Sequence, residues 1–269
     1  MMHKGYRILR GLPFMKIWPV LIAYESRTVS LSRFHLLTLA VYPLAYLLLL
    51  GAGVSGLASG NAGDTSQFVS MLADIAPGVI AMQANAPFAT MMYRYQGERQ
   101  SGLLALKLVQ GVSPLTYLIS MTTVPVLQYL GQSLVVIAGT WALGVRLSLL
   151  QVTAWLAFGI PAAVTWACLG GWLAFLIRRQ NTRMAITSMI SLPLVFSAPI
   201  FYPLESMPTY LRVMATVNPL TYQVELMRGG GQLGFPLSFS VTLGLMVVAV
   251  TVLAMLIARS EPLPGHDHT

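Results

Sequence analysis

The sequence predicts an all-α membrane protein that crosses the bilayer several times, and three observations support this class. Of the 269 residues, 56% are apolar and only 9% are charged, whereas about 25% of the residues of an average soluble domain carry a charge. The apolar residues gather into six long stretches, each able to cross ~30 Å of hydrocarbon as a helix. The alternation of polar and apolar positions that is typical of membrane β-strands is absent.

Six spanning helices are therefore expected between residues 34 and 258. A basic segment, residues 1–33, precedes them, and a short tail, residues 259–269, follows. The low content of charged residues excludes an intrinsically disordered chain and argues against a soluble domain. The six expected spans cover approximately residues 34–57, 68–92, 115–143, 152–177, 184–202 and 237–258.

The segment 1–33 combines six basic residues with apolar side chains such as Ile8, Phe14 and Trp18. This composition is typical of an amphipathic helix that lies on the anionic cytoplasmic leaflet. A loosely structured leader is the alternative. A cleavable signal peptide fits less well, because its apolar core of ~7–15 residues lies close to its charges, and here the first apolar stretch begins at about residue 34.

Basic residues are distributed unevenly between the two sides of this arrangement. Thirteen of the sixteen Lys and Arg residues fall in the N-terminal segment, the second-to-third and fourth-to-fifth connections and the tail. The other three fall on the opposite side. Because Lys and Arg are enriched on the cytoplasmic side of a membrane, both termini are expected in the cytoplasm, with the spans in the cytoplasmic (inner) membrane.

The connection from Tyr93 to Pro114 is longer than two antiparallel spans require. Its apolar residues recur at helical spacing with polar residues between them. The pattern predicts a short amphipathic helix along the membrane surface, from Glu98 to Val109 and ended by Gly111. Such a helix can dock on a cytosolic partner or only cover the end of the bundle. The residues expected to make the contact are Glu98, Arg99, Gly102, Leu103, Leu106 and Lys107.

The stretch from Ala198 to Gly231 lies on the opposite side and is too apolar for a free loop. Pro203, Pro208 and Pro219 interrupt it, so that it cannot be one spanning helix. Helical pieces that enter the outer leaflet and return are expected, with protein shielding the irregular backbone. Glu225 and Arg228, three residues apart, are expected to form an ion pair on one face of a helix.

Motifs in these two segments resemble those of one transporter family. The outer stretch contains Phe-Tyr-Pro, Met-Pro and Asn-Pro-Leu in this order and ends in Arg-Gly, which is similar to the signature of the type-2 ABC exporter permeases. The Glu98–Pro114 loop, with its acidic–basic start, its Ser-Gly-Leu step and its closing Val-Ser-Pro, resembles the coupling helix of that family. The six spans and the basic N-terminus match as well. The signature positions of the outer stretch are Pro203, Pro208, Asn218, Pro219, Glu225 and Arg228.

The resemblance implies the membrane half of an ATP-driven exporter. Two permease subunits, identical or related, would pair around a substrate path, each bound to a separate ATPase subunit that holds ATP and Mg. The cargo of such relatives includes drugs, lipids, lipid-linked glycans and other amphiphiles. The sequence is consistent with a separate ATPase subunit. A P-loop ends in Gly-Lys-Ser/Thr, and none of the three lysines of this chain follows a glycine. The chain is expected to be no enzyme by itself, to carry no cofactor or metal, and to bind no nucleic acid.

Polar side chains within the spans are candidates for the lining of the path. A polar group is costly in hydrocarbon and therefore faces a cavity or a partner. Gln83 and Asn85 of the second span and Ser188 and Ser191 of the fifth are the predicted path residues. Hydrogen bonding between helices is the alternative for each of them.

Two other functions stay open. A secondary transporter would bury several ionisable groups near the midplane, and an intramembrane enzyme that modifies lipids would need converging catalytic groups. The spans contain one clearly intramembrane carboxylate, Asp74, and a histidine, His35, only at an edge. This composition favours neither alternative over an exporter permease.

Three further features are expected to have no chemical role. Cys168 is expected to be a packing residue. The tail holds His266, Asp267 and His268, but a free end supplies no fixed geometry for a metal. Small residues at four-residue intervals predict close helix packing in the fourth span, and they are Ala163, Ala167 and Gly171.

Overall fold

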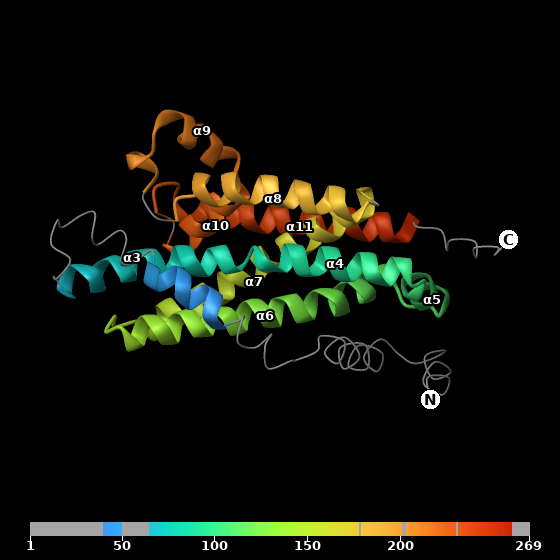
Figure 1. Ribbon diagram of the computed structural model, residues 1–269, viewed down its shortest axis with the longest axis horizontal. Helices are drawn as coiled ribbons and strands as arrows, with labels where there is room; N and C mark the ends of the chain where they lie inside the picture. Colours follow the sequence, from blue (N-terminus) through green and yellow to red (C-terminus); the bar gives the residue numbers. More distant parts are fainter. Residues whose placement is uncertain (1–39, 50–64, 178, 201–202, 230, 260–269) are drawn as a thin grey trace.

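The long helices run along the longest axis of the molecule, and short helices lie at its two ends (Figure 1). The computed structural model describes residues 40–49, 65–177, 179–200, 203–229 and 231–259, and every regular element in these ranges is helical, which confirms the expected all-α class. The expected helix of residues 1–33 and the tail histidines lie outside the described residues. The helices are Ala40–Leu49, α3 (Thr65–Gln83), α4 (Ala86–Gln100), α5 (Leu103–Val109), α6 (Pro114–Ala142), α7 (Leu149–Leu176), α8 (Gln180–Ser197), the 3-10 turn η3 (Leu204–Ser206), α9 (Thr209–Val217), α10 (Pro219–Met227) and α11 (Phe235–Arg259).

Four helical stretches of the described ranges are long and apolar enough to cross a membrane. They are Phe68–Gln100, which joins most of α3 to α4, and the helices α6, α7 and α11. α8 has 18 residues but is less apolar, because its first turn, residues 180–183, is polar throughout. Of the first expected span the structure describes Ala40–Leu49. The chain is thus a multi-pass membrane protein, and the count of six spans stays a prediction.

The second expected span is a pair of helices that reaches farther than residue 92. α3 contains Pro77, and Pro87 lies in the first turn of α4, just after the break between them. Proline suits this position, because the N–H group that it lacks would have no partner within the helix. α4 continues to Gln100 since its polar last turns pack against other helices, with Tyr95 and Glu98 buried.

Local sequence determines where α6 and α7 begin. Ser113 caps α6, and its side chain accepts a hydrogen bond from the backbone N–H of Thr116 at 3.2 Å. Ser148 and Gln151 form a capping box at the start of α7. Both arrangements satisfy N–H groups that a helix leaves free in its first turn. The resulting bounds agree closely with the expected spans 115–143 and 152–177.

Small residues allow α7 to approach its neighbours closely. A Cβ atom on Gly170 would overlap the backbone carbonyl group of Phe88 in α4, and a Cβ atom on Gly171 would meet Leu253 in α11. Cys168 is a free, buried thiol in the same region. The close packing expected for the fourth span is therefore confirmed. The other two members of the stripe, Ala163 and Ala167, are fully buried.

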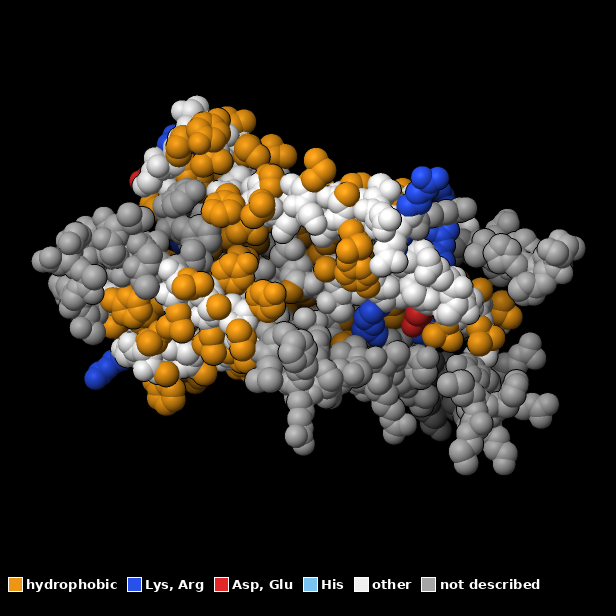
Figure 2. Space-filling model, viewed as in Figure 1, with side chains coloured by type: hydrophobic (Ala, Val, Ile, Leu, Met, Phe, Trp, Pro, Cys, Tyr) orange, Lys and Arg blue, Asp and Glu red, His pale blue; other side chains and the backbone are white. Residues whose placement is uncertain are grey.

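The two ends of the bundle carry different elements (Figure 1). α5 and the last turns of α11 lie at one end, whereas α9, α10 and the start of α3 lie at the opposite end. On the face drawn in Figure 2, hydrophobic side chains gather mainly over the half of the molecule that lies away from α5. Exposed hydrophobic side chains of the long helices include Leu127, Val248 and Met255. Contact with lipid suits such a surface. Below, "α5 end" denotes residues 93–115 and "α9–α10 segment" denotes residues 203–229.

Candidate functional site

At the α5 end, Ser101 and Gly102 separate α4 from α5. Gly102 has a φ of 72°, a backbone conformation that glycine adopts without a steric penalty. The prediction of a single helix from Glu98 to Val109 is therefore wrong, because the helix is interrupted at Gly102. Glu98 and Arg99 belong to the last turn of α4, and α5 comprises only Leu103–Val109.

A buried ion pair fixes α5 to α4. The Nζ atom of Lys107 lies 2.7 Å from Oε1 of Glu98, and the two side chains are only 6% and 10% exposed. The same ammonium group lies 5.3 Å from the ring centroid of Tyr117 in α6, where the π-electrons of the ring attract a cation. Neither charge of the pair is presented to a partner. Both hold α5 in place against α4 and α6.

Arg99 connects the end of α4 to the end of α7. Its Nη1 atom donates a hydrogen bond to the backbone carbonyl of Phe175 at 3.2 Å. Its guanidinium carbon lies 5.0 Å from the centroid of the Phe175 ring. Three of the predicted contact residues, Glu98, Arg99 and Lys107, therefore join helices of this chain to one another.

Within α5 itself, two other side chains are large, apolar and exposed, and Tyr93 and Leu115 are exposed beside it at the α5 end. Leu106 is 42% exposed and Val109 is 66% exposed. Of the remaining predicted contact residues, Gly102 is exposed and Leu103 is half-buried. Val109 was not among the predicted contact residues. Its distance of three residues from Leu106 was the available signal, because residues at this spacing share one face of a helix.

Asn218 joins α8, α9 and α10 at the other end of the molecule. Its Oδ1 atom accepts a hydrogen bond from the N–H of Leu220 at 2.9 Å and so caps α10. Its Nδ2 atom donates to the carbonyl of Leu194 at 2.6 Å and to the hydroxyl of Ser197 at 3.0 Å. Asn before Pro219 matches the preferences of a helix start.

The two other signature prolines also stand at helix starts. Pro203 precedes η3 and Pro208 precedes α9. The expected division of this stretch into helical pieces is confirmed. α10 packs against α3, α7 and α11 and is almost entirely buried, whereas α9 is mostly exposed. The depth of these pieces in the membrane stays a prediction.

Arg228 and Glu225 have separate partners, and the ion pair expected between these two described side chains is not formed. The buried carboxylate of Glu225 accepts a hydrogen bond from the N–H of Gln232 at 2.7 Å. Burial lowers the pKa of Arg228, while the charges of Glu225 and Asp74 oppose this shift. Arg228 donates hydrogen bonds to three backbone carbonyl groups, those of Pro199, Ile200 and Asp74.

A pocket of about 270 Å³ lies between α4, α7 and α8. Its wall is mainly apolar and includes Asn85, Thr187 and Ser191 as polar members. Two of the four predicted path residues, Asn85 and Ser191, therefore face one space. The other two do not line it, since Gln83 is buried elsewhere in the bundle and Ser188 is exposed on α8.

Two tryptophans attach α7 to α10, and neither was a predicted site residue. Trp166 donates from Nε1 to Oε1 of Gln223 at 2.8 Å, and Trp155 donates from Nε1 to the carbonyl of Met227 at 3.0 Å. The hydroxyl of Tyr129 in α6 donates to the carbonyl of Trp155 at 2.9 Å. A buried indole N–H needs an acceptor, so a tryptophan inside an apolar span was the signal for these contacts.

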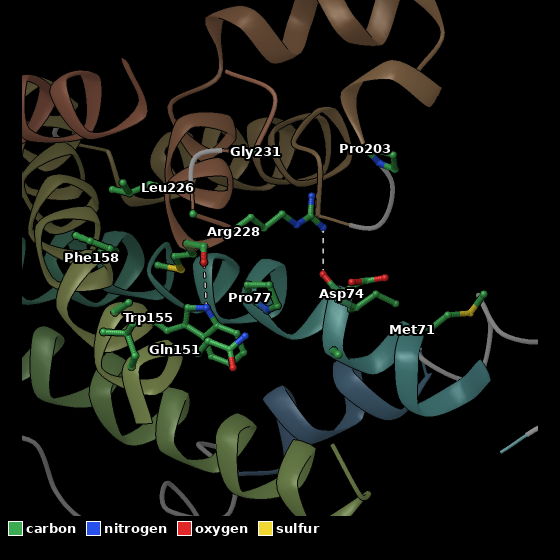
Figure 3. Close-up of a pocket in the computed structure, with 16 residues that line it drawn as sticks. Met71, Asp74, Pro77, Gln151, Trp155, Phe158, Pro203, Leu226, Arg228 and Gly231 are labelled. Atoms are coloured by element: carbon green, nitrogen blue, oxygen red, sulfur yellow. Dashed lines mark hydrogen bonds between the residues drawn. The ribbon is translucent and has the colours of Figure 1, made fainter. Parts of the chain in front are cut away.

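A cavity of about 820 Å³ lies beside these contacts, between α3, α7 and α10. Figure 3 shows Asp74 and Arg228 on one side of it and Trp155 and Phe158 on the other. Its volume falls within the range of ~300–1,000 Å³ that pockets for small molecules have. We call it the α10 cavity. Within the described ranges no group of three or more His, Cys, Asp or Glu side chains could hold a metal ion.

Comparison with known proteins agrees with this arrangement. Over 56 residues the chain is 38% identical to a protein of Cyanophora paradoxa named "Putative transport permease ycf38", and the match covers 21% of this chain and 19% of that protein. Residues 18–230 match the family described as ABC-2 type transporter. That range contains both the α5 end and the α9–α10 segment. The chain therefore belongs to the ABC-2 type transporter family, whose domain is the membrane component of a transporter.

Proposed function

We propose that this chain is the permease subunit of an ATP-driven ABC exporter in the cytoplasmic (inner) membrane, with both termini in the cytoplasm. ABC-2 permease domains generally work with a separate ATPase subunit. Two copies of that subunit bind ATP and Mg and supply the energy. A second permease subunit, identical or related, completes the substrate path.

The main support for this proposal is the exposed apolar surface of α5. Leu106 and Val109 are exposed apolar side chains on a short helix at the tip of the bundle. An apolar surface at the end of a membrane bundle would otherwise face water, and such surfaces mark interaction sites. The ATPase subunit binds this surface, and the membrane spans carry the path.

Contacts behind α5 convert its displacement into motion of the spans. The Glu98–Lys107 pair links α5 to α4, and the contacts of Arg99 with Phe175 link α4 to α7. Separating a buried ion pair leaves charges without compensation and is strongly unfavourable. A push on α5, delivered when the ATPase subunits close on ATP, therefore moves α4 and α7 with it.

The path runs past the pocket between α4, α7 and α8. Asn85 and Ser191 place polar groups in its apolar wall, a combination that suits an amphiphilic cargo such as a drug-like molecule, a lipid or a lipid-linked glycan. α8 exposes Met189, Leu192 and Phe196, and the second permease subunit covers this face. The α9–α10 segment seals the exit.

Replacement of Val109 by Asp tests the docking role of α5. The variant places a charge in the apolar contact, and we expect it to lower the amount of ATPase subunit recovered with the purified permease by about tenfold. The measurement compares this amount with that recovered with the wild-type chain at equal permease yield.

Leu149→Asp is the matched control. Leu149 is 80% exposed in the first turn of α7, far from α5, and its replacement should leave the recovery of the ATPase subunit unchanged. Equal recovery with the wild-type chain and with Val109→Asp would reject α5 as the docking element.

A further inference from the structure

The α10 cavity is bounded by charged groups on one side and by apolar side chains on the other. Asp74 of α3 and Arg228 at the end of α10 form the charged side, and Trp155, Phe158 and Leu226 belong to the opposite wall (Figure 3). At about 820 Å³ it is large enough for a drug-sized molecule. The pathway residues of the proposed function do not line it, so that its role needs a separate explanation.

Arg228, which carries the positive charge at the cavity, already donates hydrogen bonds to other groups of the chain. Both terminal nitrogens of Arg228 donate to backbone carbonyl groups, namely those of Pro199, Ile200 and Asp74. Figure 3 shows the guanidinium group reaching across to the backbone of Asp74. An anionic ligand such as a phosphate is bound best by two parallel donors of a guanidinium group, and these three contacts use three of the five N–H groups of Arg228, both of those on Nη2 among them.

The carboxylate of Asp74 is available to a ligand. Asp74 is exposed, and within the described ranges its carboxylate has no hydrogen bond or ion pair, since the contact with Arg228 uses only its backbone oxygen. Glu225, the nearest acidic residue in the sequence of α10, is buried and accepts hydrogen bonds from the N–H groups of Gln232 and Leu233. The cavity therefore presents one carboxylate that has no hydrogen bond or ion pair in the described ranges, although the charge of Arg228 acts on it from the same side.

The apolar wall is held in a fixed position. Trp155 is anchored on both sides, because its indole N–H donates to Met227 and its carbonyl accepts from Tyr129. Phe158 packs edge-to-face on Phe235 of α11, with ring centroids 5.5 Å apart. A carboxylate combined with rigid aromatic side chains in an apolar pocket is the arrangement that binds organic cations.

We propose that the α10 cavity binds a cationic amphiphile, whose charged group pairs with Asp74 and whose apolar part lies against Trp155 and Phe158. The ligand is an exported compound or a membrane lipid with an amine headgroup, since both can present a cationic group to Asp74. As a step in export this assignment rests on the proposed function. Binding itself needs neither ATP nor the ATPase subunit.

Fluorescence anisotropy of two dyes tests the assignment on the purified full-length chain in detergent. Rhodamine 6G is an aromatic cation, and Nile red is a neutral dye of similar size. We expect saturable binding of rhodamine 6G that weakens about fivefold in Asp74→Asn. Asp74→Glu, which keeps the charge, should bind nearly as well as the wild-type chain, and Nile red should not distinguish the variants.

The control variant is Glu205→Gln, which removes an exposed carboxylate of η3 outside the α10 cavity and should leave the affinity for rhodamine 6G unchanged. Displacement of the dye by phosphatidylethanolamine would identify a lipid as the ligand, and its persistence would identify an exported compound. Absence of saturable binding, or equal affinity in Asp74→Asn, would overturn the proposal. Because no ATPase subunit is present, such a result would leave the exporter function untouched.

Discussion

Single side chains hold the α5 end together, and Lys107 is the clearest case. Its ammonium group is buried between the carboxylate of Glu98 and the ring of Tyr117. Replacing Lys107 by Met keeps most of the side-chain volume but removes the ammonium group that lies 2.7 Å from the buried carboxylate of Glu98. We expect the free energy of unfolding to fall by about 3 kcal/mol, measured by denaturant titration in mixed micelles.

The double variant Glu98→Gln/Lys107→Met provides the comparison for this change. It removes both charges, and apolar or neutral replacements of a whole buried pair are often tolerated. We therefore expect it to recover most of the stability that the single variant loses. Equal stability of Lys107→Met and the wild-type chain would show that the pair does not hold α5 in place.

Asn218 has the corresponding role in the α9–α10 segment. Replacement by Ala removes the cap of α10 and both contacts to α8, so that we expect a loss of about 1–2 kcal/mol of stability. Asn218→Asp separates the two contributions, because it keeps an acceptor for the N–H of Leu220 but loses the donor to Leu194 and Ser197. It should fall between the wild-type chain and Asn218→Ala in thermal unfolding. Unchanged unfolding of the Ala variant would contradict the role of Asn218.

At the scale of helices, contact between α4 and α7 depends on one glycine. A Cβ atom on Gly170 would overlap the backbone of Phe88, which cannot move aside as a flexible side chain can. We expect Gly170→Ala to lower the free energy of unfolding by about 1–3 kcal/mol, the usual cost of overpacking. The comparison is Gly131→Ala in α6, where a Cβ atom would meet no atom within 4 Å.

Gly131→Ala should be neutral or stabilising by up to about 1 kcal/mol, because alanine favours helix more than glycine does. Thermal unfolding of both variants in the same detergent measures the difference. If both variants unfolded alike, the close approach of α4 and α7 would not limit stability.

Helix positions could be predicted where local sequence determines them. Apolar runs predicted the central parts of the long helices, and Ser113 and Ser148 stand where α6 and α7 begin. The extension of α4 to Gln100 could not be predicted from hydropathy. Its last turns are polar, and they remain helical because other elements cover them. In α8, the polar residues 180–183 lower the apolar character of the helix, and this feature is visible in the sequence.

The sequence could not predict which residues of different helices contact one another. Arg228 binds backbone carbonyl groups that are 28, 29 and 154 residues away. Because every residue has a backbone carbonyl group, the sequence does not indicate which of them Arg228 binds. Its neighbour Glu225 offered a plausible local partner, which the fold does not use. The Glu98–Lys107 pair spans a helix break, so that helical spacing gave no indication of it. Asn85 and Ser191 meet only because α4 and α8 border one pocket.

For the whole molecule, the arrangement separates two tasks. The α5 end exposes Leu106 and Val109, which the proposed function assigns to contact with the ATPase subunit, and the α9–α10 segment lies at the opposite end (Figure 1). Rigid contacts connect α5 to α4 and α4 to α7, the helix that contacts most of the others. A force applied at the α5 end can therefore reach the opposite end of the bundle, as the proposed function requires.

The most direct test of that function is transport by the reconstituted protein. Proteoliposomes that contain the permease together with its ATPase subunit should transport an amphiphilic dye when ATP and Mg are supplied on the ATPase side. Vesicles with the permease alone, with or without a proton gradient, should transport none. Gradient-driven transport by the permease alone would identify a secondary transporter, and chemical conversion of a lipid by it would identify an enzyme. Either result would contradict the account.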